Sequence, residues 1–161
     1  MGRVCAGLGL LVVAAMFAGC ATTNRGTTKE VSIRSSVSPG DDAKAVQGNW
    51  KPAAAELAGR PMPDAVLKSI SLKLDNGTYE VFVGEEPDRG TYMLDFAATP
   101  RGMTITGTDG PNKGRIFPAI YELKGDTLRI CYDLSGAKRP AEFKSIAGTR
   151  LYLVTYTRKT E

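Results

Sequence analysis

Residues 69–83 read SISLKLDNGTYEVFV, and the order of residue types in this stretch is typical of a β-hairpin. Apolar side chains occupy every second position from Ile70 to Leu74, which places them on one face of a strand. Asn76-Gly77 follows at once, and this dipeptide favours a two-residue type I′ turn between antiparallel strands. The stretch therefore predicts strands over 69–75 and 78–83.

Similar short apolar segments follow along the chain, separated by Gly, Pro, Asn and Asp. About eight or nine short strands at even spacing favour an antiparallel barrel or sandwich. One short helix is predicted over 63–69, and Pro118 within a strand predicts an edge position or a bulge there. The other predicted strands span 48–58, 90–96, 103–106, 115–123, 127–133, 142–146 and 150–158.

The N-terminal residues have the layout of a secretory signal. Arg3 supplies a positive start, and residues 4–18 are apolar and uncharged. Small residues directly before Cys20 resemble the lipobox of bacterial lipoproteins, with Phe17 where leucine is usual. We expect residues 1–19 to be a lipoprotein signal peptide and Cys20 to carry the lipid. The alternative is an uncleaved membrane anchor, because a spanning helix needs about 20 apolar residues.

The residues after the predicted lipid attachment site change in composition. Residues 21–44 are dense in Thr, Ser, Gly and charge, so they offer little apolar surface for a packed structure. We therefore expect a flexible, lipid-anchored tether over 20–44 and a folded domain over 45–161. The sequence makes no prediction of oligomeric state.

Composition excludes several kinds of chemistry. The 161 residues include three cysteines and no histidine, which removes His-based triads and His metal sites. With Cys5 in the signal and Cys20 lipidated, only Cys131 remains, and we expect it to pack rather than react. The net charge of +4 comes without a basic run interleaved with aromatics, so no nucleic acid partner is expected.

Two local motifs could carry chemistry, and both favour a structural interpretation. Glu85, Glu86 and Asp88 match no EF-hand spacing, so we expect a solvated, charged loop tip. Ser135 and Lys138 fit the S-x-x-K pattern, but they fall in a glycine-containing loop rather than on the helix that this motif requires. We therefore expect no enzymatic activity, no catalytic residue, no metal and no cofactor.

A set of motifs, taken in order, resembles a known family. Gly48-Asn49-Trp50 is similar to the G-x-W start of lipocalin-like barrels. From about Val46 to Arg158 the chain resembles a lipocalin-like domain found in many copies in planctomycete-type bacteria, with Ala119 where glycine is more frequent. The other matching positions are 90–95, Pro100, 109–111, Gly114, 120–123, 125–128, 130–132, 139–140 and Phe143.

The resemblance implies an all-β fold, a lipocalin-like, up-and-down antiparallel barrel of about eight strands with one short helix. It also implies a cell-envelope setting, and it carries over no catalytic residue. In such barrels a basic side chain of the last strand often lies over the tryptophan, which assigns Trp50 and Arg158 a structural, barrel-closing role. A cation on an indole face contributes about 0.5–2 kcal/mol.

The barrel interior is where a ligand would bind. The candidate ligand-binding residues are Leu72, Tyr79, Tyr92, Ile130 and Tyr132. The favoured hypothesis is an envelope lipoprotein, membrane-bound through its N-terminal lipid on a periplasmic or cell-surface face, that binds a small apolar or amphipathic ligand. The alternative is a filled barrel that serves as a non-catalytic interaction or structural module. The alternation predicts that Cys131 points outward. The side chains predicted to point inward are Ile70, Leu72, Leu74, Tyr79, Val81, Val83, Tyr92, Leu94, Leu128, Ile130, Tyr132, Leu151 and Leu153.

Overall fold

The computed structural model of the chain describes residues 39–160. The predicted signal peptide over 1–19, the predicted lipid site Cys20 and most of the predicted tether lie outside the described residues. Residues Ser36–Glu161 form one compact unit with its own hydrophobic core. This segment is therefore suited to study on its own.

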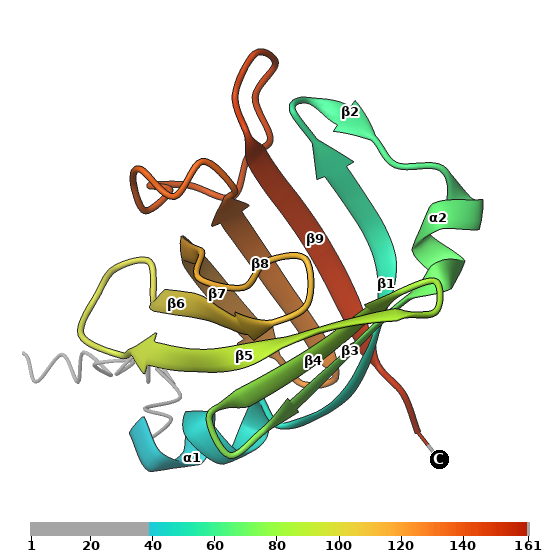
Figure 1. The fold of residues 1–161 in the computed structure, drawn as a ribbon. Coiled ribbons are helices and arrows are strands. Elements are labelled where there is room, and N and C mark those ends of the chain that lie inside the picture. The colour runs from blue at the N-terminus through green and yellow to red at the C-terminus, as the bar shows by residue number, and fades with distance from the viewer. Residues whose placement is uncertain (1–38, 161) are drawn as a thin grey trace, which may run out of the picture. The chain divides into compact units, whose positions relative to one another are not determined.

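The described residues form a closed antiparallel β-barrel (Figure 1). Neighbouring strands along the sheet are mostly consecutive in sequence, and β1 also pairs with β9, which closes the ring. The predicted eight-stranded up-and-down barrel is confirmed, with β2 as a short addition beside β1. The elements are α1 (Pro39–Ala45), β1 (Gly48–Leu57), β2 (Arg60–Pro61), α2 (Asp64–Ser69), β3 (Ile70–Asp75), β4 (Thr78–Val83), β5 (Glu86–Asp95), β6 (Gly102–Asp109), β7 (Ile116–Lys124), β8 (Thr127–Asp133) and β9 (Leu151–Arg158).

The predicted hairpin is present as β3 and β4. Asp75 pairs with Thr78, and Asn76 and Gly77 both have positive φ angles, 43° and 79°, as a type I′ turn requires. The predicted short helix is also confirmed, since α2 begins at Asp64 directly after Pro63. These two elements lead into one wall of the barrel.

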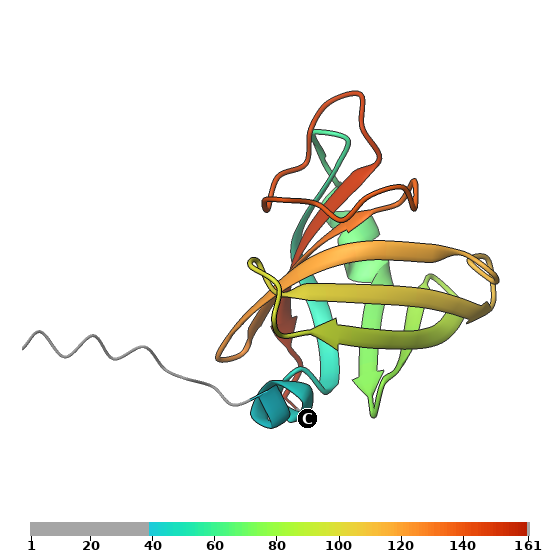
Figure 2. The same cartoon turned by 90° about the vertical axis from the view of Figure 1, so that its left-hand side faces the viewer.

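The two ends of the barrel differ. α1 lies at one end, and the long connection between β8 and β9 lies at the other, as both views show (Figures 1 and 2). Within α1, Asp42 is 3% exposed and accepts a hydrogen bond from the Tyr121 hydroxyl at 3.1 Å, while its carboxylate also pairs with Arg101. The folded unit therefore begins before residue 45, inside the segment expected to be a tether. A tertiary contact to Tyr121 orders this segment, and its composition gives no sign of it.

Residues 134–150 contain no strand, so the predicted strand over 142–146 is wrong. This segment instead lies over the outer face of β8. The Cys131 thiol donates to the Lys144 carbonyl at 3.5 Å, and the Arg129 guanidinium donates to the Phe143 carbonyl at 3.1 Å. Cys131 points out of the barrel interior as expected, yet it is fully buried beneath this segment. Burial raises the pKa of its thiol, which fits a packing role.

Two further predictions concern Pro118 and β9. Pro118 has an edge position on the β8 side, although β7 is an inner strand: it pairs with Thr104 of β6, and the pairing of β7 with β8 begins one residue later at Ala119. The missing N–H therefore interrupts no central ladder. The inward face of β9 carries Val154 and Tyr156 rather than Leu151 and Leu153, so the predicted parity of this strand is wrong.

Candidate ligand-binding site

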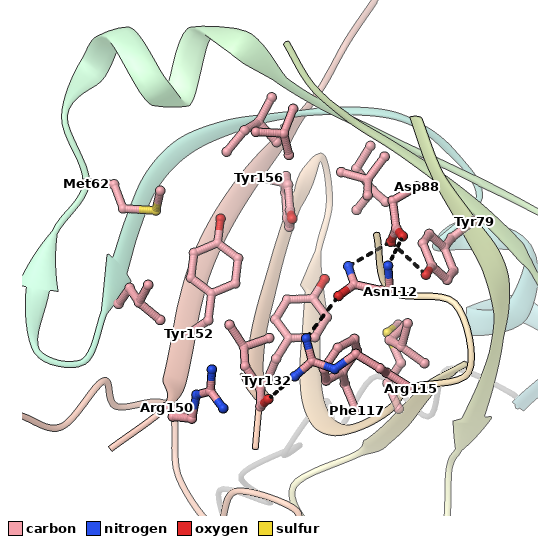
Figure 3. Close-up of a pocket in the computed structure, with 18 of the residues that line it drawn as sticks. Met62, Tyr79, Asp88, Asn112, Arg115, Phe117, Tyr132, Arg150, Tyr152 and Tyr156 are labelled. Atoms are coloured by element: carbon pink, nitrogen blue, oxygen red, sulfur yellow. Dashed lines mark hydrogen bonds between the residues drawn. The ribbon is translucent and has the colours of Figure 1, made fainter. Parts of the chain in front are cut away.

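The barrel contains a cavity of about 360 Å³ that opens at the end away from α1 (Figure 3). This volume lies near the lower limit of the range of about 300–1,000 Å³ that is usual for small-molecule sites. Most lining residues are apolar or aromatic, and the polar ones are few. The lining residues are Leu57, Met62, Val66, Ile70, Leu72, Leu74, Tyr79, Val81, Val83, Asp88, Met103, Ile105, Asn112, Arg115, Phe117, Tyr132, Leu134, Arg150, Tyr152 and Tyr156.

Strand alternation produces the apolar wall. Leu72 and Leu74 of β3 are buried beside Val81 of β4, because residues two apart on a strand share a face. The chain between β2 and α2 covers one side of the mouth, where Met62 donates its backbone N–H to the Ala55 carbonyl at 2.8 Å. Met62, with a flexible side chain, and Val66 of α2 line this part of the opening.

Three of the four tyrosines that line the cavity lie on β8 and β9. The rings of Tyr132 and Tyr152 stack with their centroids 5.8 Å apart, and Tyr156 follows on β9. Burial raises the pKa of all three phenols, that of Tyr152 to about 12, so each is protonated at neutral pH. Within residues 39–160 the Tyr152 hydroxyl has no hydrogen-bond partner, so it can donate to a ligand.

A buried carboxylate stands in the wall opposite these tyrosines. Asp88 is 6% exposed. One of its carboxylate oxygens accepts a hydrogen bond from the Asn112 backbone N–H at 2.9 Å. The other oxygen accepts hydrogen bonds from the Asn112 side-chain amide at 3.0 Å and from the Tyr79 hydroxyl at 2.9 Å. Burial, with the nearby Asp88 carboxylate, raises the pKa of Tyr79. The prediction that Asp88 belongs to a solvated loop tip is therefore wrong. Asp88 belongs to β5 and faces inward. Glu85 and Glu86 are exposed.

Two arginines stand at the mouth. The Arg115 guanidinium lies 4.8 Å from the centroid of Phe117, and it donates to the Leu134 carbonyl at 3.0 Å and to the Asn112 side-chain oxygen at 3.4 Å. The Leu134 N–H donates in turn to the Arg150 carbonyl at 3.0 Å. Leu134 therefore connects the two arginines at the adjoining ends of β7, β8 and β9.

The opposite end of the barrel is sealed. The Arg158 guanidinium lies 4.2 Å from the ring centroid of Trp50. It donates to the carbonyls of Ala45 and Gln47 at 2.6 and 2.7 Å, and the Trp50 indole N–H donates to the Val46 carbonyl at 2.9 Å. Trp50 and Arg158 thus hold the chain after α1 against the barrel, which is the structural role expected of them.

The structure brings together three of the five candidate ligand-binding residues. Leu72, Tyr79 and Tyr132 line the cavity. Tyr92 and Ile130 do not, because both are packed in the buried core. The sequence did not point to six of the lining residues, Tyr152, Tyr156, Asp88, Asn112, Arg115 and Arg150. The signal for the two tyrosines was the alternation Tyr152, Val154, Tyr156, but Leu151 and Leu153 alternate in the same way on the opposite face of the strand.

Two other features of residues 39–160 bear on function. No helix in this part of the chain is both long and apolar enough to cross a membrane. These residues also contain no group of three or more Cys, Asp or Glu side chains placed to hold a metal ion.

Comparisons with known proteins give one structural neighbour. No family model matches the sequence, and no curated protein matches it. The chain is similar to the crystal structure of a DUF4847 family protein from Bacteroides vulgatus ATCC 8482, with a TM-score of 0.44 and 13% identity, over 73% of this chain and 96% of that chain. The description of that protein names no ligand.

Proposed function

We propose that this protein binds a small apolar or amphipathic ligand inside its barrel. The observation that carries the proposal is the cavity of about 360 Å³, which opens at one end of an otherwise closed barrel. Barrels of about eight strands are either filled by side chains or hold one small ligand. A filled barrel would favour the alternative, an interaction or structural module, and the cavity supports ligand binding instead.

The chemistry of the lining supports the same class of ligand. Transfer of apolar ligand surface from water into such a cavity contributes about 25 cal/mol per Å². A few convergent polar groups then fix the ligand's orientation, and the Tyr152 hydroxyl is one such donor. The ligand should therefore be mostly apolar with at least one hydrogen-bond acceptor.

The groups that line the cavity support binding without catalysis. The lining contains no cysteine, serine or lysine. Its one carboxylate, Asp88, accepts three hydrogen bonds from Tyr79 and Asn112 and so has a structural role. In this lining the Tyr79 hydroxyl donates to Asp88, but burial and that carboxylate raise the pKa of the phenol, so it is not an activated nucleophile, and we propose that the protein is not an enzyme.

The envelope setting is part of the proposal. The apolar N-terminal run that ends at Cys20 supports a lipoprotein signal with the lipid on that cysteine. The motif resemblance over about Val46 to Arg158 supports a planctomycete-type lipocalin-like domain. Together they favour a binding barrel held at a membrane by its N-terminal lipid.

The test is native mass spectrometry of the segment 36–161, produced in the source cells and purified without detergent. We expect a fraction of the protein to carry one small molecule, which denaturing extraction then releases for identification. Apo protein that also fails to take up the neutral apolar dye N-phenyl-1-naphthylamine would overturn the proposal.

A further inference from the structure

We propose that the ligand is an amphipathic anion whose head group is bound at the cavity mouth by Arg115 and Arg150. This inference rests on the proposed function and adds the chemical class of the ligand. The apolar part of the molecule would occupy the cavity, and the negatively charged head would meet the two guanidinium groups, with the Tyr152 hydroxyl as a further donor.

The two arginines lie at the ends of neighbouring strands. Arg115 immediately precedes β7, Arg150 immediately precedes β9, and Leu134 immediately follows β8, which lies between those strands. Two backbone contacts of Leu134 fix this arrangement, one from the Arg115 guanidinium and one to the Arg150 carbonyl, each at 3.0 Å. Both side chains line the cavity and are labelled in Figure 3.

The charge of the two arginines is not neutralised by a carboxylate within the described residues. Among residues 39–160, neither Arg115 nor Arg150 forms an ion pair with a carboxylate. A guanidinium has five N–H donors, and the hydrogen bonds of Arg115 go to the Leu134 carbonyl and the Asn112 amide oxygen, both neutral. The mouth thus presents two positive charges with donors to spare. The arginines that do pair with carboxylates are Arg89, Arg101, Arg139 and Arg158.

The nearby carboxylates accept hydrogen bonds from other residues. Asp133, next to Leu134, accepts hydrogen bonds from the backbone and hydroxyl of Ser135 and from the Lys138 N–H. Asp88 is held by Asn112 and Tyr79, and Figure 3 shows it on the side of the cavity away from Arg150. The Asp88 charge repels a second anion on that side, so it favours a head group at Arg150, with Arg115, which Asn112 bridges to Asp88, as the second partner.

The cavity size limits the apolar part of the ligand. A volume of about 360 Å³ is at the small end for ligand sites, so it suits a single short chain or a small ring system. The exposed apolar side chain of Val83 at the mouth, 57% exposed, extends the apolar surface outward. The shared chemistry is therefore one apolar group with one carboxylate, sulfonate or phosphate head.

The test uses two dyes that differ by one charged group. 8-Anilino-1-naphthalenesulfonate carries a sulfonate, and N-phenyl-1-naphthylamine has the same ring system without it. We expect the segment 36–161 to bind the sulfonate dye more tightly. Arg150→Gln should weaken that binding about three- to tenfold and change the affinity for the neutral dye less than about twofold, because only the charged head loses a partner.

Matched variants separate charge from structure. Lys124→Gln removes the same charge at the opposite end of the barrel, where Lys124 pairs with Thr127, and should alter neither affinity. Arg115→Lys keeps the charge and should retain most of the sulfonate affinity, whereas Arg115→Gln should lose it. Raising the ionic strength should weaken only the sulfonate dye, since salt screens charge at an exposed mouth.

The outcomes distinguish this inference from the proposed function. Equal affinity for the two dyes, unchanged in Arg150→Gln and Arg115→Gln, would overturn the anionic head and leave ligand binding intact. Failure of both dyes to bind would overturn both. Melting curves of every variant show whether a lost affinity reflects a lost fold.

Discussion

Replacement of Arg158 by methionine should destabilise the barrel strongly, although the residue lies at the end of the last strand. The guanidinium covers the Trp50 ring and donates to the carbonyls of Ala45 and Gln47. Methionine keeps an apolar stem over the indole but removes every donor. The two carbonyls, in half-buried residues, then lose their partners.

The magnitude follows from these contacts. A hydrogen bond from a charged donor contributes about 1.5–3 kcal/mol, and a cation on an indole face about 0.5–2 kcal/mol. The ion pair with Asp126, whose side chain is 79% exposed, adds little because solvent screens it. Since these contributions are not additive and methionine retains some packing, we expect a loss of about 3 kcal/mol, or about 10 °C in Tm for a domain of this size.

Thermal unfolding of the segment 36–161, followed by circular dichroism, measures this loss. Arg60→Met is the matched control, because Arg60 is an exposed residue of β2 without a side-chain hydrogen bond or ion pair within residues 39–160. This substitution should change the free energy of unfolding by less than about 0.5 kcal/mol. A Tm for Arg158→Met within about 3 °C of the unchanged protein would refute the sealing role of this residue.

Three further predictions concern pH and processing. Burial alone would raise the pKa of Asp133, but hydrogen bonds from Ser135 and Lys138 hold this pKa below its ordinary value. The ionised Asp133 therefore stabilises the folded state above about pH 4, and this contribution is lost as pH falls through the lower folded-state pKa. Urea titrations should therefore show a shallower loss of stability between about pH 5 and 2 in Asp133→Asn; the same slope in both proteins would contradict this. Burial raises the pKa of Tyr152 to about 12, so the stability due to its neutral phenol is complete below about pH 10 and is lost as pH rises toward 12. Absorbance at 295 nm should show this phenol ionising near pH 12 in the folded protein, and ionisation of every tyrosine near pH 10 would be inconsistent with a buried ring. Cys20→Ser should abolish lipidation, seen as a changed mass and lost membrane partitioning of the full chain, and unchanged processing would exclude a lipoprotein.

The barrel could be predicted because its signals are local. Asn76-Gly77 sets the turn between β3 and β4, and Leu72 and Leu74 mark the inward face of β3. The closure by Trp50 and Arg158 was accessible only through the family resemblance, because these residues are paired across the first and last strands.

The rest depends on contacts between distant residues. Apolar side chains occur on both the inward and the outward face of β9. Residues 134–150 cover part of the outer face of the barrel, and the cavity tyrosines line the inner face. Asp88 looks solvated beside Glu85 in the sequence, and its burial depends on donors from distant residues, Asn112 in the β6–β7 connection and Tyr79 of β4. Whether the barrel is hollow depends on the sum of side-chain volumes around the ring, which no local pattern gives.

The hollow barrel is tested most directly by filling it. Val81 of β4 lines the cavity, and the next residue, Phe82, points away from it. We predict that a fluorescence titration with N-phenyl-1-naphthylamine shows saturable 1:1 binding to the unchanged segment 36–161 and to Phe82→Trp, and that Val81→Trp, still folded by its melting curve, loses at least about tenfold in affinity. Equal binding by a folded Val81→Trp would contradict a ligand site inside the barrel.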